Sequence, residues 1–245
     1  RNKASAGVQA RYDTSFQAHS PMEPRAAVAW VRAGKTEVWC GTQDAFFVRG
    51  RVASITGQEP EQVVVHPHRM GGGFGGRIQC QPSEEAARLS MAVGRPVRVQ
   101  WSREAEMSAN YFQPIFSHHI DVGADFEGRL THWQHDFVTS PILFGSMREL
   151  LGEGRLARGT IGAMDYFVAD MGSIRGAQPS YRVADKRVRY ASVRSPVPTS
   201  AWRGLGAAPN AFAMECAMDE LAHAAGVDSL QLRLRNLSRT EDSRL

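Results

Sequence analysis

The sequence predicts an α+β or mixed α/β fold, in which helices pack on mixed sheets. Strand-like and helix-like segments alternate through residues 26–101, which favours such an arrangement. Two further strand-like runs flank a glycine-containing connection at 123–128, as in an antiparallel pair. The 245 residues are 42% hydrophobic and 22% charged, so the chain can bury a core.

The first part of the chain is marked by residues that begin and end elements. Strands over 26–31 and 36–40 are joined by a short turn with Gly34, which is typical of a hairpin. A helix over 45–55 ends at Gly57, and a strand follows at 61–65. The next helix has Ser83 as its N-cap and ends at Gly94, before a strand at 96–101. The first of these helices carries the apolar residues Phe46, Phe47, Val52 and Ile55, and the second is expected to bury Ala86, Leu89, Met91 and Ala92.

The second part predicts an antiparallel patch and two closing helices. Strands are expected over 118–122 and 130–138, and the alternation within 182–193 indicates more strand. Apolar residues at helical spacing predict a helix over 211–225 that ends at Gly226. Asp228 is the expected N-cap of a last helix over 229–237. Residues 140–180 show little periodicity.

Composition excludes several classes of protein. The net charge of +4 comes from scattered arginines without a basic run, so we expect no nucleic-acid partner. The three cysteines, Cys40, Cys80 and Cys216, have no metal-site spacing and are interpreted as small buried hydrophobes. No stretch reaches the roughly 18 apolar residues that a membrane helix needs. The first residue is not Met and the last residues are polar, so we expect a fragment of a longer protein.

The stretch with the clearest chemistry is the glycine loop, residues 70–77, in which five glycines surround Phe74. Glycine lets backbone amides approach a ligand closely, and a helix is expected after the loop. An anionic, phosphate-bearing ligand fits this arrangement. The spacing matches neither the dinucleotide fingerprint nor the P-loop, so neither mechanism can be transferred.

A second loop, the arginine loop at residues 195–206, holds Arg203 between prolines and glycines. There the guanidinium can bind phosphate or another oxygen-rich group, or it can neutralise helix C-termini or pair with Glu215. Gln43, at a strand end, is by itself typical of a turn. His19 and Glu23 form a catalytic pair or, as we favour, fix a rigid loop by hydrogen bonds.

Together these residues resemble one protein family. Six motifs occur in the order seen in the molybdopterin-binding large subunit of the xanthine dehydrogenase/aldehyde oxidase family, with the bacterial isoquinoline 1-oxidoreductase and nicotinate or aldehyde dehydrogenase branch most similar. The motifs are His-Ser-Pro-Met-Glu-Pro at 19–24, Gly-Thr-Gln at 41–43, the glycine loop, Gly-Arg-Pro-Val at 94–97 with Trp-Ser-Arg-Glu at 101–104, Trp-Arg-Gly at 202–204 and Met-Asp-Glu-Leu-Ala at 218–222.

The resemblance implies a set of cofactor-binding residues. Gln43 would lie beside the oxo group of the metal, the loop amides and the Phe74 ring would face the dithiolene, and Arg203 would line the molybdenum site. No residue would ligate the metal directly. The residues implied in cofactor binding are Gln43, Gly72, Gly73, Phe74, Gly75 and Arg203.

The resemblance also implies what this chain lacks. Leu205, in the substrate pocket, stands where the purine-oxidising branch has Phe, and Ile78-Gln79 stands where that branch has Glu, so purine is not the expected substrate. The catalytic Glu of the family belongs to a later segment, so no catalytic residue is expected here. Residues 1–245 would form the first molybdopterin-binding domain, with subdomains at approximately 1–110 and 111–245, and the second such domain would be absent.

The implied parent protein is a molybdenum hydroxylase that oxidises an aldehyde or an N-heteroaromatic compound with water as the oxygen source. Its implied cofactor is molybdopterin, in the cytosine dinucleotide form, with molybdenum. Its implied partners are an iron–sulfur subunit and a flavin or cytochrome electron acceptor, in the cytoplasm or periplasm of a bacterium. Two alternatives stay open: a scaffold that kept the fold without the cofactor, and an unrelated nucleotide-phosphate-binding protein.

Overall fold

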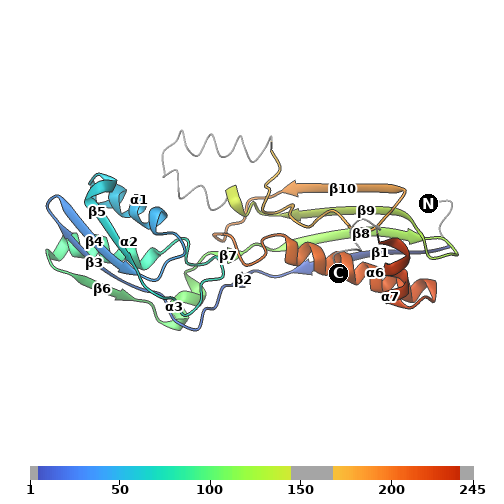
Figure 1. Ribbon diagram of the computed structural model, residues 1–245, viewed down its shortest axis with the longest axis horizontal. Helices are drawn as coiled ribbons and strands as arrows, with labels where there is room; N and C mark the ends of the chain where they lie inside the picture. The colour runs from blue at the N-terminus through green and yellow to red at the C-terminus, as the bar shows by residue number, and fades with distance from the viewer. Residues whose placement is uncertain (1–4, 145–167, 238–245) are drawn as a thin grey trace.

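The computed structural model describes residues 5–144 and 168–237. It is elongated and has two main parts, each a four-stranded sheet with helices against one face (Figure 1). The predicted mixed α/β class is therefore confirmed. Within the described residues, no helix is both long enough and apolar enough to cross a membrane.

The first sheet has the strand order β5-β4-β3-β6. The expected hairpin joins β3 to β4 in antiparallel register, and Gly34 in its turn has a φ of 71°. β5 pairs parallel with β4, and β6 pairs antiparallel with β3. Two helices, α1 and α2, pack on this sheet. The bounds are β3 (Ala26–Arg32), β4 (Lys35–Cys40), α1 (Ala45–Thr56), β5 (Val63–Pro67), α2 (Gln81–Val93) and β6 (Val97–Gln100).

Helix α1 begins and ends close to where the sequence predicts. The Asp44 carboxylate accepts a hydrogen bond from the amide of Phe47, and Gly57 ends the helix with a φ of 67°. Of the apolar residues that this helix carries, Phe47 and Val52 are buried, whereas Phe46 is 75% exposed. Val48 and Ala53 occupy the inward positions instead.

Helix α2 buries a different face from the one expected. Leu89 and Met91 are each 48% exposed, whereas Ala86, Ala87 and Ser90 are buried. Ala27 and Ala29 of β3 form part of the same cluster, so small side chains on both elements allow close packing. Ser83 is not the N-cap, because the helix begins at Gln81 and the cap position is Cys80.

The second sheet has the order β1-β8-β9-β10. β8 and β9 form the expected antiparallel pair, and β10 pairs parallel with β9. β1, which the sequence did not reveal, pairs antiparallel with β8 over its whole length. The bounds are β1 (Ala6–Thr14), β8 (Phe116–Ala124), β9 (Leu130–Thr139) and β10 (Asp185–Ser192).

Two helices lie beside the second sheet (Figure 1). α6 (Ala207–Ala225) begins before the predicted residue 211 and ends at Gly226 as expected. α7 (Ser229–Asn236) has the predicted cap, since the Asp228 carboxylate accepts from the amide of Gln231. Residues from α6 and α7 pack on Trp133 and other residues of the sheet to form its core.

Short elements lie between the two sheets (Figure 1): β2 (Gln17–Ala18) pairs with β7 (Phe112–Gln113), and α3 (Arg103–Ser108) follows β6. A 3₁₀ turn (Pro60–Gln62) precedes β5, beside the turn of the β3–β4 hairpin. The division of the chain near residue 110 stays a prediction. β1 precedes that residue in the sequence but pairs with β8 of the second sheet, which follows it. Cys40 and Cys80 are buried as expected, and Cys216 is partly buried.

Candidate functional site

The glycine loop, residues 70–77, connects β5 to α2 with an unusual backbone. Gly72, Phe74 and Gly75 have φ values of 107°, 55° and 101°. L-residues with a Cβ rarely adopt such values, and Phe74 itself is one of three described non-glycine residues that do. The Phe74 ring is 41% exposed, so this strained backbone holds an aromatic side chain at the surface.

Gln43 fixes the loop through its side chain. Its Oε1 accepts hydrogen bonds from the amides of Gly75, at 2.9 Å, and Arg77, at 3.2 Å. A Cβ on Gly73 would lie 2.6 Å from that oxygen, so only glycine fits there. Since the oxygen must face the two amide donors, the Nε2 amino group points elsewhere. Nε2 makes no hydrogen bond to the described residues and is left as a donor at the exposed side of Gln43.

Three successive amides of the glycine loop have no acceptor within the described residues: those of Gly72, Gly73 and Phe74. Their neighbours are satisfied, because Gly71 donates to Glu23 Oε2 at 2.7 Å and Gly76 donates to the Gly73 carbonyl at 2.9 Å. Successive unpaired amides in a loop that alternates the sign of φ can bind an anion.

The arginine loop, residues 195–206, lies against the glycine loop. The amide of Arg203 donates to the Phe74 carbonyl at 2.9 Å. A Cβ on Gly75 would lie 2.1 Å from the Ala201 carbonyl oxygen, so the two backbones touch at this point. The structure thus brings together Gln43, the glycine loop and Arg203, from segments that are far apart in the sequence.

The Arg203 guanidinium is exposed and makes no ion pair or hydrogen bond with the described residues. The alternative that it pairs with Glu215 was wrong. Glu215 accepts instead from Tyr181 and forms an ion pair with Arg233 at 2.8 Å. The Arg203 charge is therefore available to a ligand.

Leu205 has a φ of 56° and packs on an apolar cluster that includes Phe137 of the second sheet. Its backbone amide donates to the Trp202 carbonyl at 2.7 Å, which closes a tight turn. Its place in a substrate pocket stays a prediction.

Glu23 and His19 both hold loop backbone by hydrogen bonds, which favours the hydrogen-bonding interpretation over a catalytic pair. Glu23 Oε2 accepts from Gly71 and forms an ion pair with the buried Arg77 at 3.1 Å. His19 Nε2 lies 2.8 Å from the Ala201 carbonyl oxygen and must carry the proton, because a carbonyl only accepts. Burial lowers the pKa of His19 to about 4, so the imidazole is neutral at pH 7.

His19 also touches the glycine loop. A Cβ on Gly76 would lie 2.6 Å from the His19 ring, so the imidazole fills the space beneath this glycine. His19 therefore links both loops, by packing on one and by a hydrogen bond to the other. Sequence reasoning missed this role, because the partners, Gly76 and Ala201, are distant in the chain.

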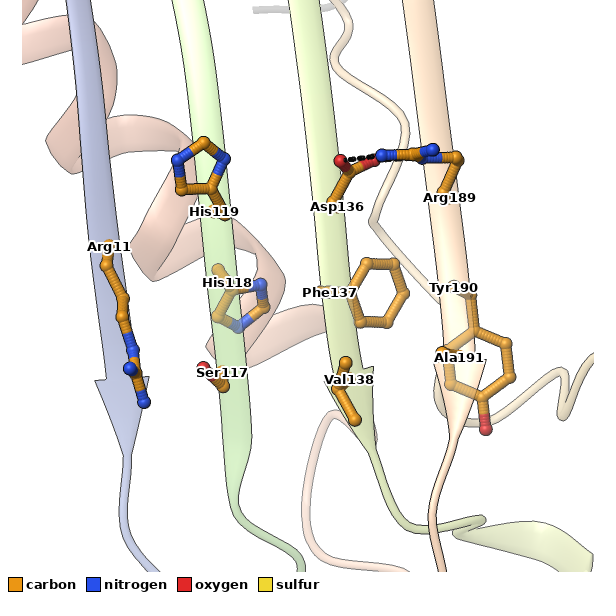
Figure 2. Close-up of a pocket in the computed structure, with 10 residues that line it drawn as sticks. All are labelled: Arg11, Ser117, His118, His119, Asp136, Phe137, Val138, Arg189, Tyr190 and Ala191. Carbon is orange, nitrogen blue, oxygen red and sulfur yellow. Dashed lines mark hydrogen bonds and ion pairs between the residues drawn. The ribbon is translucent and has the colours of Figure 1, made fainter.

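A separate hollow of about 610 Å³ lies along the second sheet (Figure 2). Arg189 binds Asp136 across β9 and β10 in this hollow. Arg11, which also lines the hollow, binds Asp13. Among the described residues, no group of three or more His, Cys, Asp or Glu is arranged to hold a metal ion.

Residues 2–143 and 157–237 match a family model described as a molybdopterin cofactor-binding domain. The chain belongs to this family. A molybdopterin-binding domain needs donors for an anionic, oxygen-rich ligand, and the free amides, Gln43 Nε2 and the Arg203 guanidinium are such donors. The glycines let Gln43, His19 and the Ala201 carbonyl pack directly against the loop backbone, which holds these donors in place. The residues present therefore fit the cofactor class.

Curated relatives agree with this assignment. The chain is 30% identical over 228 residues to the beta subunit of isoquinoline 1-oxidoreductase from Brevundimonas diminuta, and 33% identical over 237 residues to a nicotinate dehydrogenase subunit from Pseudomonas putida. These alignments cover 92% and 96% of this molybdopterin-binding chain, but only 27% and 19% of the relatives. The chain thus spans about a quarter of their length or less.

Solved structures show the same fold. The aldehyde oxidoreductase of Desulfovibrio gigas superposes with a TM-score of 0.74 at 26% identity, over 97% of this chain and 24% of that one. Quinoline 2-oxidoreductase from Pseudomonas putida superposes with a TM-score of 0.79 at 23% identity, over 98% and 29% of the two chains. The resemblance to the molybdenum-containing xanthine dehydrogenase/aldehyde oxidase family is confirmed, whereas the roles of individual site residues stay predictions.

Proposed function

We propose that this chain is the first molybdopterin-binding domain of a molybdenum hydroxylase that oxidises an aldehyde or an N-heteroaromatic compound, with water as the oxygen source. The observation that carries the proposal is the convergence of Gln43, the glycine loop and Arg203, whose donors have no acceptor among the described residues. The relatives named isoquinoline 1-oxidoreductase, nicotinate dehydrogenase and aldehyde oxidoreductase supply the two substrate classes.

Each residue group would have a distinct task. The amides of Gly72, Gly73 and Phe74 and the amino group of Gln43 would donate to oxygen or sulfur atoms of the cofactor, and Arg203 would neutralise its negative charge. Gly75 would keep the two loops in contact. When bound, the cofactor supplies the two-electron redox chemistry, while the chain supplies orientation and electrostatics. We further propose the cytosine dinucleotide form.

Other parts of the parent protein would complete the enzyme. The Glu23 carboxylate, which contacts the glycine loop, is engaged by Gly71 and Arg77, so it is not free to act as a base. We therefore propose that the catalytic group lies outside this chain and that the chain alone is inactive. The isoquinoline and nicotinate relatives are each one subunit of a larger enzyme, which supports partners. We propose these partners to be an iron–sulfur subunit and a flavin or cytochrome electron acceptor.

Substitution of Arg203 tests this function in the full-length parent with its partner subunits. We expect Arg203→Ala to reduce molybdenum content and turnover while the unfolding temperature stays unchanged, because the guanidinium has no bond to the described fold. Arg203→Lys should have a molybdenum content and turnover between those of the wild type and Arg203→Ala, since lysine keeps the charge but lacks the bidentate fork. Elemental analysis, turnover and thermal unfolding are the readouts.

Arg189→Ala is the matched control, because Arg189 is also an exposed arginine but lies on the second sheet outside the two loops. It should keep full metal content. Wild-type metal content and activity in Arg203→Ala would remove Arg203 from the site. Nucleotide binding by the chain without any molybdenum would favour the unrelated phosphate-binding alternative, and no ligand at all would favour the scaffold.

A further inference from the structure

Three arginines line a hollow of about 410 Å³ at the end of the second sheet that lies away from the first sheet (Figure 1). This three-arginine hollow is lined by Arg129, Leu130, Arg182, Val183, Ala184, Arg235 and Asn236. Leu130 begins β9, whereas Phe137, in the cluster that Leu205 joins, lies near the other end of that strand. At roughly 3.3 Å per residue, about 23 Å of strand separates the two. The hollow is therefore distinct from the glycine and arginine loops.

One buried side chain fixes the segments around the hollow. Asn236 is 3% exposed; its Oδ1 accepts from the Leu130 amide at 2.9 Å, and its Nδ2 donates to the Gly128 carbonyl at 2.8 Å. Arg129 lies between these two partners in the sequence. The Asn236 carbonyl accepts from the Arg182 amide at 2.7 Å. The β8–β9 turn, the segment before β10 and the end of α7 are thus held in fixed positions relative to one another.

The positive charge of the hollow is only partly neutralised. Arg129 Nη1 forms an ion pair with Glu127 Oε2 at 2.6 Å, and Arg235 Nη1 donates to the Glu127 carbonyl at 3.1 Å. Asp125, another carboxylate of this turn, accepts from the backbone amides of Glu127 and Arg129. The Arg182 guanidinium has no hydrogen-bond or ion-pair partner among the described residues. Glu127 is thus the one lining or adjacent carboxylate, among those described, that pairs with any of the three guanidinium groups.

The end of α7 does not need these arginines. Basic side chains in the last turn of a helix can neutralise its carbonyl groups. Here other donors reach those carbonyls: the Leu232 carbonyl accepts from Asn236 Nδ2 at 2.8 Å, and the Arg233 carbonyl accepts from the Leu237 amide at 2.9 Å. The guanidinium groups around the hollow therefore remain available to an external anion.

We propose that the three-arginine hollow binds the phosphate group of a small molecule, either inorganic phosphate or a phosphate monoester. A guanidinium offers a planar fork of N–H donors that matches two phosphate oxygens. Arg182 provides a complete fork, and Arg129 and Arg235 add the donors that Glu127 does not use. Three guanidinium groups and one carboxylate leave two positive charges, which match a phosphate close to its dianionic form at pH 7 better than a single carboxylate. Leu130, Val183 and Ala184 give the hollow an apolar side for the organic part of an ester.

Calorimetric titration of the full-length parent, with its partner subunits, tests the site. Inorganic phosphate and phenyl phosphate are titrated separately at constant ionic strength set by chloride. We expect saturable binding that Arg182→Ala weakens about tenfold, because one charge-assisted pair is lost. The unfolding temperature should not change, since the Arg182 guanidinium has no bond to the described fold. Tighter binding of phenyl phosphate would identify an ester as the ligand, and equal binding would identify the phosphate group alone. Binding of neither probe, or equal affinity in the wild type and Arg182→Ala, would overturn the proposal.

Two arginines outside the hollow supply matched controls. Arg187 is an exposed arginine of β10 whose Nη2 donates to Gln134 Oε1 at 2.7 Å, and Arg187→Ala should keep the wild-type affinity. Arg203→Ala should keep it too, because the arginine loop lies at the other end of the sheet. Loss of phosphate binding in Arg203→Ala, with retention in Arg182→Ala, would place the anion at the glycine and arginine loops and overturn the proposal. Binding that depends on Arg182 in protein without molybdenum would contradict the proposed function alone.

Discussion

The two halves of the molecule build their cores from side chains of different size. Beneath α1 and α2, the first sheet buries small residues, among them Ala27, Ala29 and Val38. Between the second sheet and its helices, the core includes large residues, among them Trp133 of β9 and Met218 of α6. Small residues let helices approach a sheet closely, whereas large residues bury more apolar area each. The first half thus depends on close fit and the second on a few large contacts.

The two halves also contribute to the site in different ways. The first half uses side chains, since Gln43 and Glu23 accept hydrogen bonds from amides of the glycine loop and Glu23 also pairs with Arg77. The arginine loop, from the second half, approaches by its backbone, through the Ala201 carbonyl and the Arg203 amide. The shape of the glycine loop therefore depends on side chains of the first half, whereas the contact between the two loops depends on space for close backbone approach.

The largest loss of stability is expected from a substitution in the core of the second half. Trp133→Ala should reduce the free energy of unfolding by about 3–5 kcal/mol, because the indole is fully buried. Val52→Ala, at a fully buried position of α1, should cost about 2 kcal/mol. Urea unfolding of the two variants measures the difference. Equal losses would contradict the comparison of the cores.

The contact between the loops can be broken at one glycine. Gly75→Ala places a methyl group 2.1 Å from the Ala201 carbonyl oxygen at a φ of 101°, so strain and overlap add. Gly204→Ala has a φ of 91°, but its nearest neighbour is 3.9 Å away, so only backbone strain remains, about 1–3 kcal/mol. Gly75→Ala should lose more stability and more molybdenum; a larger loss in Gly204→Ala would show that the loops do not need this contact.

Acid should weaken the second half through a buried histidine. His118 Nδ1 lies 3.0 Å from His135 Nε2, and His135 Nδ1 lies 3.2 Å from the Ala177 carbonyl, so each ring donates once while neutral. Burial lowers the pKa of His118 to about 3, against an ordinary value near 6.5. The unfolded chain then binds more protons between these values, so stability falls as the pH drops through that window.

The loss from His118 should reach about 2 kcal/mol between pH 7 and pH 5. His118→Asn keeps a donor towards His135 but cannot titrate, so the variant should lose less stability over this range. Urea unfolding at the two pH values measures the change in the free energy of unfolding for the wild type and for the variant. The account of this histidine pair fails if the wild type and the variant respond equally to acid.

The smallest change in stability is expected from a substitution on the open side of the second sheet. Arg189 and Asp136 form an ion pair, but their side chains are 61% and 30% exposed. Water and salt screen such pairs, so Arg189→Gln should leave the unfolding midpoint unchanged within experimental scatter. A clear loss of stability would mean that the hollow in Figure 2 contributes to the fold.

Local signals explain which elements the sequence revealed. The β3–β4 hairpin, the end of α1 at Gly57 and the cap of α7 at Asp228 depend on neighbouring residues, and all three are confirmed. β1 was not revealed, because its partner is β8, more than a hundred residues away. The buried face of α2 was wrong because packing against small residues of β3 prevailed over hydrophobicity.

The candidate site shows the same limit. Motifs identified Gln43, the glycine loop and Arg203, and the structure brings them together. No local pattern shows that His19 fills the space under Gly76, because this contact is set by the packing of distant segments. The glycines of the loop were the one sequence signal for such close approaches, because a residue with a Cβ would not fit there.

Molybdenum and nucleotide content of the full-length parent tests the central claim most directly. The protein is produced with its neighbouring subunits in a host that makes the cofactor, and acid releases any nucleotide. The account predicts near-stoichiometric molybdenum together with cytidine monophosphate. Folded protein with neither metal nor nucleotide would contradict it and leave a scaffold that shares only the fold.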